Sequence, residues 1–174
     1  MFLGDGTVGK SALLLTYTQQ QFPEAYTPTL VPGEIIAEGK NRLLLTDTPG
    51  QKEYKRLRML SFKNTTVFVL LFAIDNKMSF DNVEDDWFKE IREHDPEGKI
   101  PFVLVGTKKD VRESAGEACI SAKDGQALAT KLGAVEYIEL SAKSADRDGV
   151  SGLFTLVFNL ATGNYKKKGK CTIL

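Results

Sequence analysis

The stretch Gly4-Asp-Gly-Thr-Val-Gly-Lys-Ser11 decides the fold of this chain. It fits the pattern G-x-x-x-x-G-K-[ST] of a phosphate-binding loop. Glycines at these positions let consecutive backbone N–H groups converge on a phosphate, in a concavity that a Cβ atom would obstruct. The apolar residues after Ser11 predict a helix, whose N-terminal dipole favours an anion. The alternative is that this stretch is an ordinary strand, turn and helix that binds no ligand. Each further motif described below makes this alternative weaker.

Length and composition indicate one globular domain. The chain has 174 residues, of which 42% are hydrophobic and 26% charged, as in an ordinary soluble protein. The formal net charge is zero, which gives no sign of nucleic-acid binding. Two cysteines, Cys119 and Cys171, are too few for a disulfide framework and fit a reducing compartment. The sequence shows no internal repeat, no domain linker and no apolar run long enough to span a bilayer.

Segments typical of strands alternate with segments typical of helices. Strands are predicted at 30–38, 42–47, 66–75, 101–106 and 136–140, and helices at 53–60, 79–94, 123–132 and 150–161. This order predicts an α/β fold with a six-stranded, mostly parallel sheet, one antiparallel strand, and helices on both faces. Only three residues precede Gly4, so we expect a short first strand and lower stability than a complete first strand would give.

A second motif, Asp47-Thr-Pro-Gly-Gln51, also follows a predicted strand. Asp47 can ligate Mg²⁺ directly or through water, together with the Ser11 hydroxyl, while Lys10 reaches the outer phosphates. Gly50 allows a backbone N–H to approach a γ-phosphate, and Gln51 can orient an attacking water. An Asp at a strand end is commonly a turn or helix cap, and here the following residues favour the metal site.

Two further loops follow the next predicted strands, and they suit a guanine base. In Gly106-Thr-Lys-Lys-Asp110 the Asp110 carboxylate can accept two hydrogen bonds from guanine, whereas adenine offers no such paired donors on that edge. The aliphatic part of Lys108 can lie across the base plane. In Ser141-Ala-Lys143 the Ala142 N–H can meet the guanine O6. Each loop alone is typical of a surface turn, but their order after consecutive strands favours a binding site.

Together with Thr29, these motifs resemble those of small GTPases of the Ras superfamily, and the resemblance covers nearly the whole chain. Four stretches resemble the Rho/Rac branch in particular: Gly4-Asp-Gly6, Phe22-Pro-Glu-Ala-Tyr-Thr-Pro-Thr29, Tyr54-Lys-Arg-Leu-Arg-Met-Leu-Ser61, and Thr107 in place of Asn. The resemblance implies a P-loop GTPase fold, or G domain, over residues 1–163, followed by a basic tail at 164–174.

The resemblance also implies roles for single residues. Gln51 and Lys10 would act in GTP hydrolysis, and Ser11, Thr29 and Asp47 would ligate Mg²⁺. Phe22 would stack edge-on against guanine, Tyr26 would close over the phosphates, and Thr29 would bind the metal only when the γ-phosphate is present. The residues expected to bind GTP or GDP are Gly4, Asp5, Gly6, Thr7, Val8, Gly9, Lys10, Ser11, Ala12, Phe22, Tyr26, Thr29, Gly50, Thr107, Lys108, Asp110, Ser141, Ala142 and Lys143.

The chain departs from the Rho pattern at several positions. Pro49 stands where the family has Ala, and because proline lacks an N–H and fixes φ, we expect slower switching or hydrolysis. Leu30-Val-Pro-Gly-Glu34 replaces Val-Phe-Glu-Asn-Tyr, so effector identity does not carry over. Thr46 replaces a Trp, and too few residues separate Asp110 from Ser121 for the extra helix of the Rho branch. The sequence is therefore Rho-like.

The tail suggests a membrane anchor. It ends in Cys171-Thr-Ile-Leu174, which resembles a C-a-a-X geranylgeranylation signal although Thr172 is not aliphatic. A free cysteine in a basic tail is the alternative. One lipid chain anchors weakly, so Lys166, Lys167, Lys168 and Lys170 would supply a second signal at anionic lipid. We expect the protein at the cytoplasmic face of a membrane, most simply the plasma membrane, in exchange with the cytosol.

These observations predict a monomeric, Mg²⁺-dependent GTP switch in signal transduction. The resemblance implies two switch segments, 20–34 and 49–62, which would lose order when the γ-phosphate leaves and would bind exchange factors, activating proteins, dissociation inhibitors and effectors. No arginine finger can be assigned within the chain, so we expect a partner to supply one. Two alternatives stay open: a GTP-binding scaffold with impaired hydrolysis because of Pro49, and a truncated fragment that does not bind nucleotide. A P-loop ATPase or kinase fits less well, because Asp110 and Ala142 favour guanine.

Overall fold

A four-stranded parallel sheet forms the centre of the computed structural model, which describes residues 1–23, 35–38, 41–144 and 147–166. The strands are β1 (Phe2–Leu3), β4 (Phe68–Ala73), β5 (Phe102–Thr107) and β6 (Tyr137–Glu139), in the order β1-β4-β5-β6. Every residue of β4 and β5 is buried, which agrees with the continuous apolar runs that predicted them. The register places Phe2 beside Val69 and Val69 beside Val103.

The hairpin strands β2 (Ile35–Glu38) and β3 (Asn41–Leu44) pair with each other, antiparallel, as a separate two-stranded sheet. The predicted fold class is confirmed, but within the described part of the chain the strands divide into four and two. β1 contacts the segment after β3 through the Phe2 N–H, which donates to the Thr46 carbonyl at 3.0 Å, and through the Thr48 hydroxyl, which donates to the Phe2 carbonyl at 2.7 Å. Because β1 has two residues, it offers few groups for a longer ladder.

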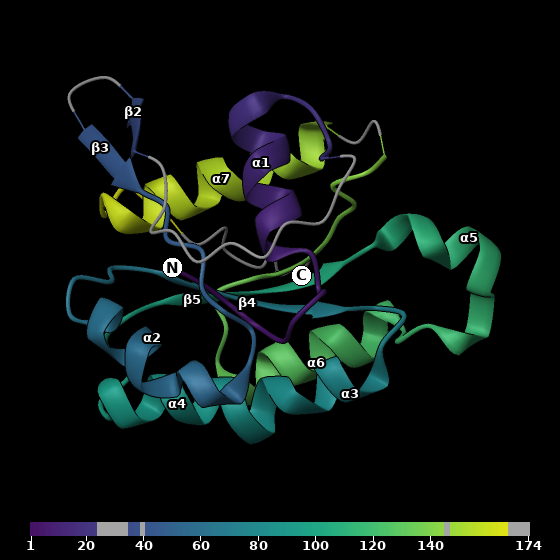
Figure 1. Ribbon diagram of the computed structural model, residues 1–174, viewed down its shortest axis with the longest axis horizontal. Coiled ribbons are helices and arrows are strands. Elements are labelled where there is room, and N and C mark those ends of the chain that lie inside the picture. The colour runs from purple at the N-terminus through teal and green to yellow at the C-terminus, as the bar shows by residue number, and fades with distance from the viewer. Residues whose placement is uncertain (24–34, 39–40, 145–146, 167–174) are drawn as a thin grey trace, which may run out of the picture.

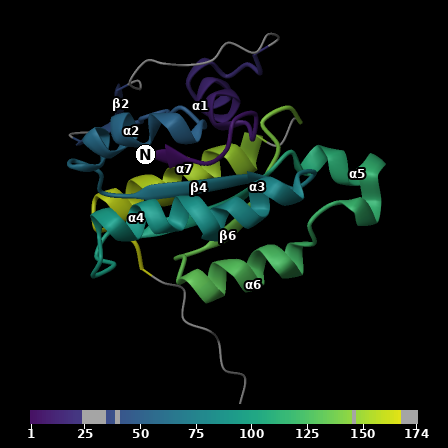
Figure 2. The same ribbon diagram turned by 60° about the horizontal axis from the view of Figure 1, so that its bottom comes forward.

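Helices cover both faces of the parallel sheet (Figures 1 and 2). On one face lie α1 (Lys10–Gln19) and α7 (Arg147–Ala161), where the rings of Tyr17 and Phe154 stack at 3.7 Å between centroids. The other face carries α2 (Lys55–Phe62), α3 (Lys77–Asn82), α4 (Phe88–His94) and α6 (Ala122–Leu132). Each face has its own cluster of buried apolar side chains, as expected for a doubly covered sheet.

The helix expected at 79–94 begins earlier and has a wider turn in its middle. Asn76 caps α3, because its side-chain oxygen accepts the Ser79 N–H at 3.1 Å. Between α3 and α4 lies the π-helical turn η2 (Val83–Trp87), in which the Phe88 N–H bonds the Val83 carbonyl five residues back. Such turns occur frequently at functional sites, and this one contains Trp87, the single tryptophan of the chain.

Short helical segments complete the chain. Before α2 lies the 3₁₀ turn η1 (Lys52–Tyr54), and after β5 follow η3 (Lys109–Val111), α5 (Arg112–Ala115) and η4 (Gly116–Ala118). The helix α6 ends at Gly133, which adopts the left-handed conformation with φ of 81° that favours glycine after a helix. In the residues described, no helix is long and apolar enough to cross a membrane.

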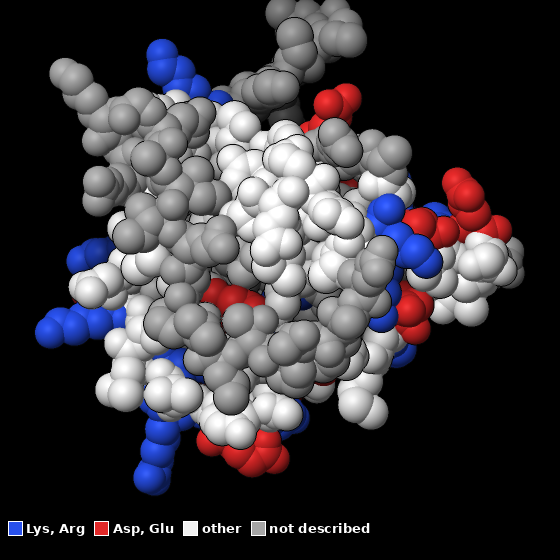
Figure 3. Space-filling view, turned by 45° about the horizontal axis from the view of Figure 1, so that its top comes forward, with Lys and Arg blue, Asp and Glu red and all other residues white. Residues whose placement is uncertain are grey.

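The topology brings the sequence motifs to one edge of the sheet. Residues 4–9 follow β1, residues 107–110 close β5, and residues 140–143 follow β6. Ligands of open parallel sheets bind beyond these carboxyl ends, where loops from neighbouring strands meet. On the face shown in Figure 3, most of the Lys, Arg, Asp and Glu side chains lie around the periphery, uncharged side chains gather above the centre, and one acidic group lies close to the centre.

Candidate nucleotide-binding site

The loop between β1 and α1 is held in a conformation that suits an anion. Gly4 has φ of 150°, and a Cβ there would lie 2.3 Å from the Leu71 carbonyl oxygen of β4, so only glycine fits. Gly9 has φ of 94° immediately before α1, and Thr7 also lies in the left-handed region, with φ of 63°. Backbone strain of this kind is typical of ligand-binding loops.

Lys10 is buried beneath this loop. Its Nζ donates to the Gly4 carbonyl at 2.8 Å and to the Asp5 carbonyl at 2.7 Å. Burial lowers the pKa of Lys10 to about 8, although Asp47 and Asp5 partly oppose this shift. No carboxylate whose placement the structure describes forms an ion pair with Lys10. A buried cation held only by carbonyl dipoles is suited to an anionic ligand.

Ser11 and Asp47 offer adjacent oxygen atoms beside the loop. The Ser11 hydroxyl donates to Asp47 Oδ2 at 2.5 Å, and the Thr48 N–H donates to the other carboxylate oxygen at 3.0 Å. Mg²⁺ prefers oxygen ligands and usually combines one or two carboxylates with substrate phosphates and water. Within the described ranges no group of three or more His, Cys, Asp or Glu could hold a metal alone. These residues fit a Mg²⁺ that phosphates help to ligate.

At the other end of the site, Asp110 and Ser141 are joined directly. The Ser141 hydroxyl donates to Asp110 Oδ1 at 2.5 Å and accepts the N–H groups of Lys143 at 3.1 Å and Ser144 at 3.0 Å. Lys108 has φ of 61°, and its Nζ lies 3.3 Å from the Asp75 carboxylate. The loops after β5 and β6 therefore fix each other, and they fix the orientation of the Asp110 carboxylate.

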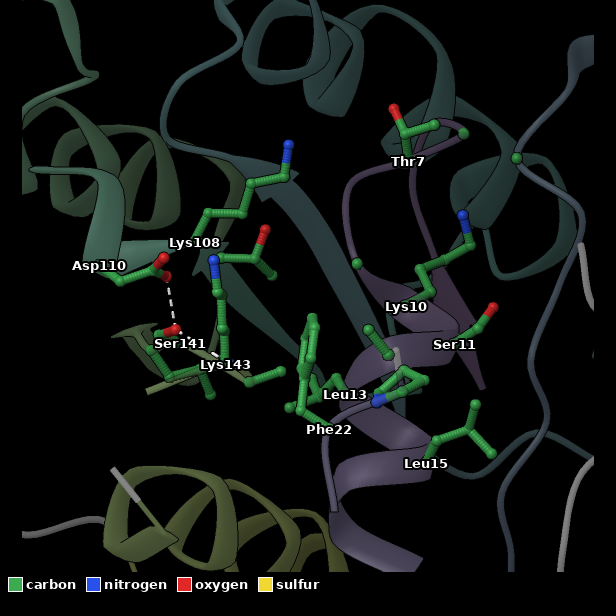
Figure 4. A pocket seen from close by; sticks show the side chains of 18 of the residues that line it. Thr7, Lys10, Ser11, Leu13, Leu15, Phe22, Lys108, Asp110, Ser141 and Lys143 are labelled. Carbon is green, nitrogen blue, oxygen red and sulfur yellow. Dashed lines mark hydrogen bonds between the residues drawn. The ribbon is translucent and has the colours of Figure 1, made fainter. Parts of the chain in front are cut away.

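One cavity of about 560 Å³ connects the two ends. Figure 4 shows Lys10 and Ser11 at one end, Asp110 and Ser141 at the other, and Phe22 between them. Volumes of several hundred Å³ are usual for sites that bind small molecules. The expected site residues that line it are Gly6, Thr7, Gly9, Lys10, Ser11, Ala12, Phe22, Gly50, Gln51, Thr107, Lys108, Asp110, Ser141, Ala142 and Lys143.

Four expected residues lie outside the lining, and others lie outside the described residues. Gly4, Asp5 and Val8 form the rear of the loop, and Asp47 reaches the site through Ser11. Tyr26, Thr29 and Cys171 fall in the ranges 24–34 and 167–174, which the structure does not describe. The lining also contains Leu13, Leu15, Pro23, Thr48, Pro49, Val111 and Leu140. These residues adjoin the motifs in sequence, so proximity to the motifs was the signal that could have found them; only Pro49 was singled out beforehand, for another reason.

Gly50 lies directly against the phosphate-binding loop. A Cβ at Gly50 would be 2.3 Å from the Gly6 nitrogen and 2.6 Å from the Asp5 carbonyl oxygen. No side chain can be accommodated at that distance, so the 47–51 segment requires glycine here. The peptide groups on either side of Gly50 are thereby placed next to Gly6.

Two hydrogen-bonded groups support the phosphate-binding loop from behind. The Asp5 carboxylate accepts from Asn82 Nδ2 and from Trp87 Nε1, both at 2.7 Å. The Thr107 hydroxyl lies 2.6 Å from the Val8 carbonyl and 3.0 Å from the Phe72 carbonyl. The Asp5 contacts were not expected from the sequence, because they join residues separated by 77 and 82 positions.

Comparison with known protein families agrees with this geometry. The model of the Ras family matches residues 1–172. The chain belongs to the Ras family. Members of the Ras family bind GTP and GDP, generally with Mg²⁺, and hydrolyse GTP, so the chain is a small GTPase that acts as a GTP-dependent switch. The predicted superfamily and enzyme class are confirmed. The phosphates and Mg²⁺ that members of the Ras family bind are also the ligands that Lys10, Ser11 and Asp47 fit.

Proposed function

We propose that this chain is a Rho-like small GTPase that works in signal transduction. The observation that carries the proposal is the continuous cavity between the Lys10 end and the Asp110 end, which suits a whole guanine nucleotide. The Rho-like branch rests on the sequence resemblance, and two residues of that resemblance, Asp5 and Thr107, make contacts that hold the phosphate-binding loop. Asp5 binds Trp87, and Thr107 binds the Val8 carbonyl.

At the phosphate end, Lys10 would exchange its two backbone carbonyls for the outer phosphates. The Ser11 hydroxyl and the Asp47 carboxylate would hold Mg²⁺, with Thr29 added in the GTP form. When bound, Mg²⁺ neutralises charge on the phosphate oxygens. The Gly50 N–H would contact the γ-phosphate, and Gln51 would orient the attacking water. Gln51 is exposed, so a water molecule can reach it from solvent.

At the base end, Asp110 would select guanine. Ser141 occupies Oδ1 of its carboxylate, and this bond fixes the plane in which the carboxylate meets the two guanine donors. The Ala142 N–H would meet the guanine O6, while Lys108 and Phe22 would contact the base. A site built around paired polar groups discriminates strongly against a ligand that lacks one of them, because a buried acceptor is then left without a partner.

The second switch segment, 49–62, has a surface suited to protein partners. Tyr54, Leu57 and Leu60 are exposed, Leu60 by 77%, and clustered exposed apolar side chains commonly mark interaction sites. Regulators and effectors of the small GTPase kind would bind here and at 20–34. The basic tail with a prenylated Cys171 would place the protein at the cytoplasmic face of a membrane, with the plasma membrane as our first choice.

Nucleotide extraction from the purified protein, followed by identification, tests the ligand. We expect GDP or GTP. Asp110→Asn then tests the base selector by comparison of GDP with inosine diphosphate, which lacks the 2-amino group. The parent should prefer GDP by about 10-fold or more, since a hydrogen bond to a charged group contributes ~1.5–3 kcal/mol, and Asp110→Asn should narrow that preference.

Glu113→Gln is the control for this comparison, because Glu113 is exposed on α5 and does not line the cavity. It should keep the parent's preference for GDP. A preference that survives Asp110→Asn unchanged would assign base selection to another residue.

A further inference from the structure

Arg58 is a buried arginine, and Phe62 is the other buried residue of its helix. Arg58 lies on α2 with 1% of its surface exposed. Its Nη2 lies 2.7 Å from Glu90 Oε1, and its Nε donates to the other carboxylate oxygen at 3.2 Å. The guanidinium carbon also lies 4.6 Å from the centre of the Trp87 ring. The guanidinium is therefore fixed in position and in plane by α4 and η2.

The remaining guanidinium nitrogen binds the segment that contains Gly50. Arg58 Nη1 donates to the Pro49 carbonyl at 3.0 Å and to the Gln51 carbonyl at 2.5 Å. These two carbonyls stand on either side of Gly50. One side chain thus joins the buried Glu90 to the peptide group directly before Gly50 and to the peptide group after Gln51, while Gly50 itself lies against Gly6.

The planarity of the peptide bond gives this contact a direction. The Pro49 carbonyl and the Gly50 N–H belong to the same trans peptide group, so they point in opposite directions. A guanidinium that holds the carbonyl therefore directs the Gly50 N–H away from Arg58. Likewise, a fixed Gln51 carbonyl restricts the backbone from which the Gln51 side chain projects.

The neighbouring ion pairs differ from the Arg58–Glu90 pair, because they are exposed. Lys52 pairs with Asp86 and Lys55 with Glu93, both at 2.8 Å, and both join the same segment to η2 and α4. Their lysines are exposed by 64% and 40%, and such pairs contribute little to stability. In the part of the chain that the structure describes, Arg58 is the arginine that reaches the 49–51 carbonyls.

We propose that Arg58, held by Glu90, is a positioning residue for GTP hydrolysis. It fixes the Gly50 N–H and the Gln51 backbone relative to the phosphate-binding loop, so that the water held by Gln51 meets the γ-phosphate in line. The proposal rests on the proposed role of Gln51. Arg58 itself contacts no substrate and acts through the two carbonyls.

Two variants of Arg58 test the proposal. Arg58→Met/Glu90→Met replaces the buried pair with apolar side chains of similar length, a change that often preserves the fold. Arg58→Lys keeps the charge for Glu90 but cannot hold the carboxylate and both carbonyls as a planar fork does. Glu93→Gln is the control, since it neutralises an exposed acid on α4, the helix that carries Glu90. Single-turnover GTP hydrolysis, affinities for GDP and for a slowly hydrolysed GTP analogue, and melting temperature are measured for each.

We expect hydrolysis to fall about 10-fold or more in both Arg58 variants, because small displacements of positioned groups are costly to the chemical step. GDP affinity should stay within about 3-fold of the parent, while affinity for the GTP analogue falls relative to GDP, because the Gly50 N–H contacts only the third phosphate. Glu93→Gln should match the parent in every measurement.

Hydrolysis within about 2-fold of the parent in either Arg58 variant would overturn the proposal. So would equal losses of GDP and analogue affinity together with a lower melting temperature, because they would show a structural role alone. Gln51→Ala separates this inference from the proposed function. If Gln51→Ala hydrolyses GTP at the parent rate, the role of Gln51 is wrong; if only Gln51→Ala is slow, the role of Arg58 is wrong.

Discussion

Pro49 combines two restrictions in one residue. Its ring fixes φ and removes an N–H, and its carbonyl accepts a hydrogen bond from Arg58 at 3.0 Å. Gly50 follows it and lies against Gly6, so the peptide group between them can change orientation only if the proline backbone allows it. An alanine at this position would keep the Arg58 contact and restore conformational freedom.

We therefore expect Pro49→Ala to hydrolyse GTP faster than the parent. The gain should be about 2- to 5-fold, since the backbone restriction imposed by a proline corresponds to ~0.4–1 kcal/mol. Single-turnover hydrolysis measures it. Pro101→Ala serves as a control because Pro101 precedes β5 and does not line the cavity. Equal rates for the parent and Pro49→Ala would show that Pro49 does not limit the reaction.

Single residues differ in how far sequence could predict them. Asp110 and Ser141 were found because each stands in a short motif at a fixed distance from a strand end, and strand ends meet at one edge of a parallel sheet. Arg58 was not found, because an arginine in a short polar helix is typical of an exposed surface. Its partner Glu90 is 32 residues away, and burial of such a pair depends on how two helices pack.

At the scale of elements, the last residue of β5 connects the sheet to the phosphate-binding loop. The Thr107 hydroxyl has one hydrogen, which can go to the Val8 carbonyl or the Phe72 carbonyl, and both contacts are buried. The loop thus has a fixed attachment to two central strands. This attachment matters because β1, which leads into the loop, consists of two residues.

Thr107→Val should destabilise the protein and release GDP faster. It leaves a buried carbonyl without a partner at a cost of ~1–3 kcal/mol, which corresponds to a melting temperature several degrees lower for a domain of this size. Thermal melting at fixed GDP and Mg²⁺ and the GDP dissociation rate are the measurements. Thr130→Val is a matched control, because the Thr130 hydroxyl is exposed and bonds only within α6. An unchanged dissociation rate would contradict this attachment.

Helices and strands could be predicted where the apolar residues followed a single spacing, that of a helix or that of a buried strand. The buried runs that became β4 and β5 and the amphipathic α6 lie within one or two residues of their expected bounds. The π-helical turn η2 was not predicted, since side-chain spacing over 79–94 fits an uninterrupted helix. The separation of β2 and β3 from the parallel sheet was also missed, because ladder formation depends on strand β1 and not on the hairpin sequence alone.

For the whole molecule, the sheet covered on both faces followed from the alternation of strands and helices, and the site followed from the edge where their loops meet. Two segments for which we made predictions lie beyond what the structure describes. They are residues 24–34, which make up most of the first switch segment, and residues 167–174 of the basic tail.

Membrane attachment is tested on the full chain after prenylation. Cys171→Ser should lower partitioning onto anionic vesicles by about 10-fold or more, because it removes the site of the prenyl group and leaves only the lysines, at ~1 kcal/mol each. Cys119→Ser is the control, since Cys119 is buried in the apolar cluster on one face of the sheet and is not part of the C-a-a-X sequence. Equal partitioning of the parent and Cys171→Ser would refute the anchor.

The placement of Trp87 has an optical consequence. It is the only indole of the chain, and it lies between the guanidinium of Arg58 and the carboxylate of Asp5. One neighbour belongs to the helix of the second switch segment and the other to the phosphate-binding loop. The ultraviolet emission of the purified protein therefore originates where the second switch segment meets the phosphate-binding loop. The native chain carries a fluorophore where a label would otherwise have to be introduced.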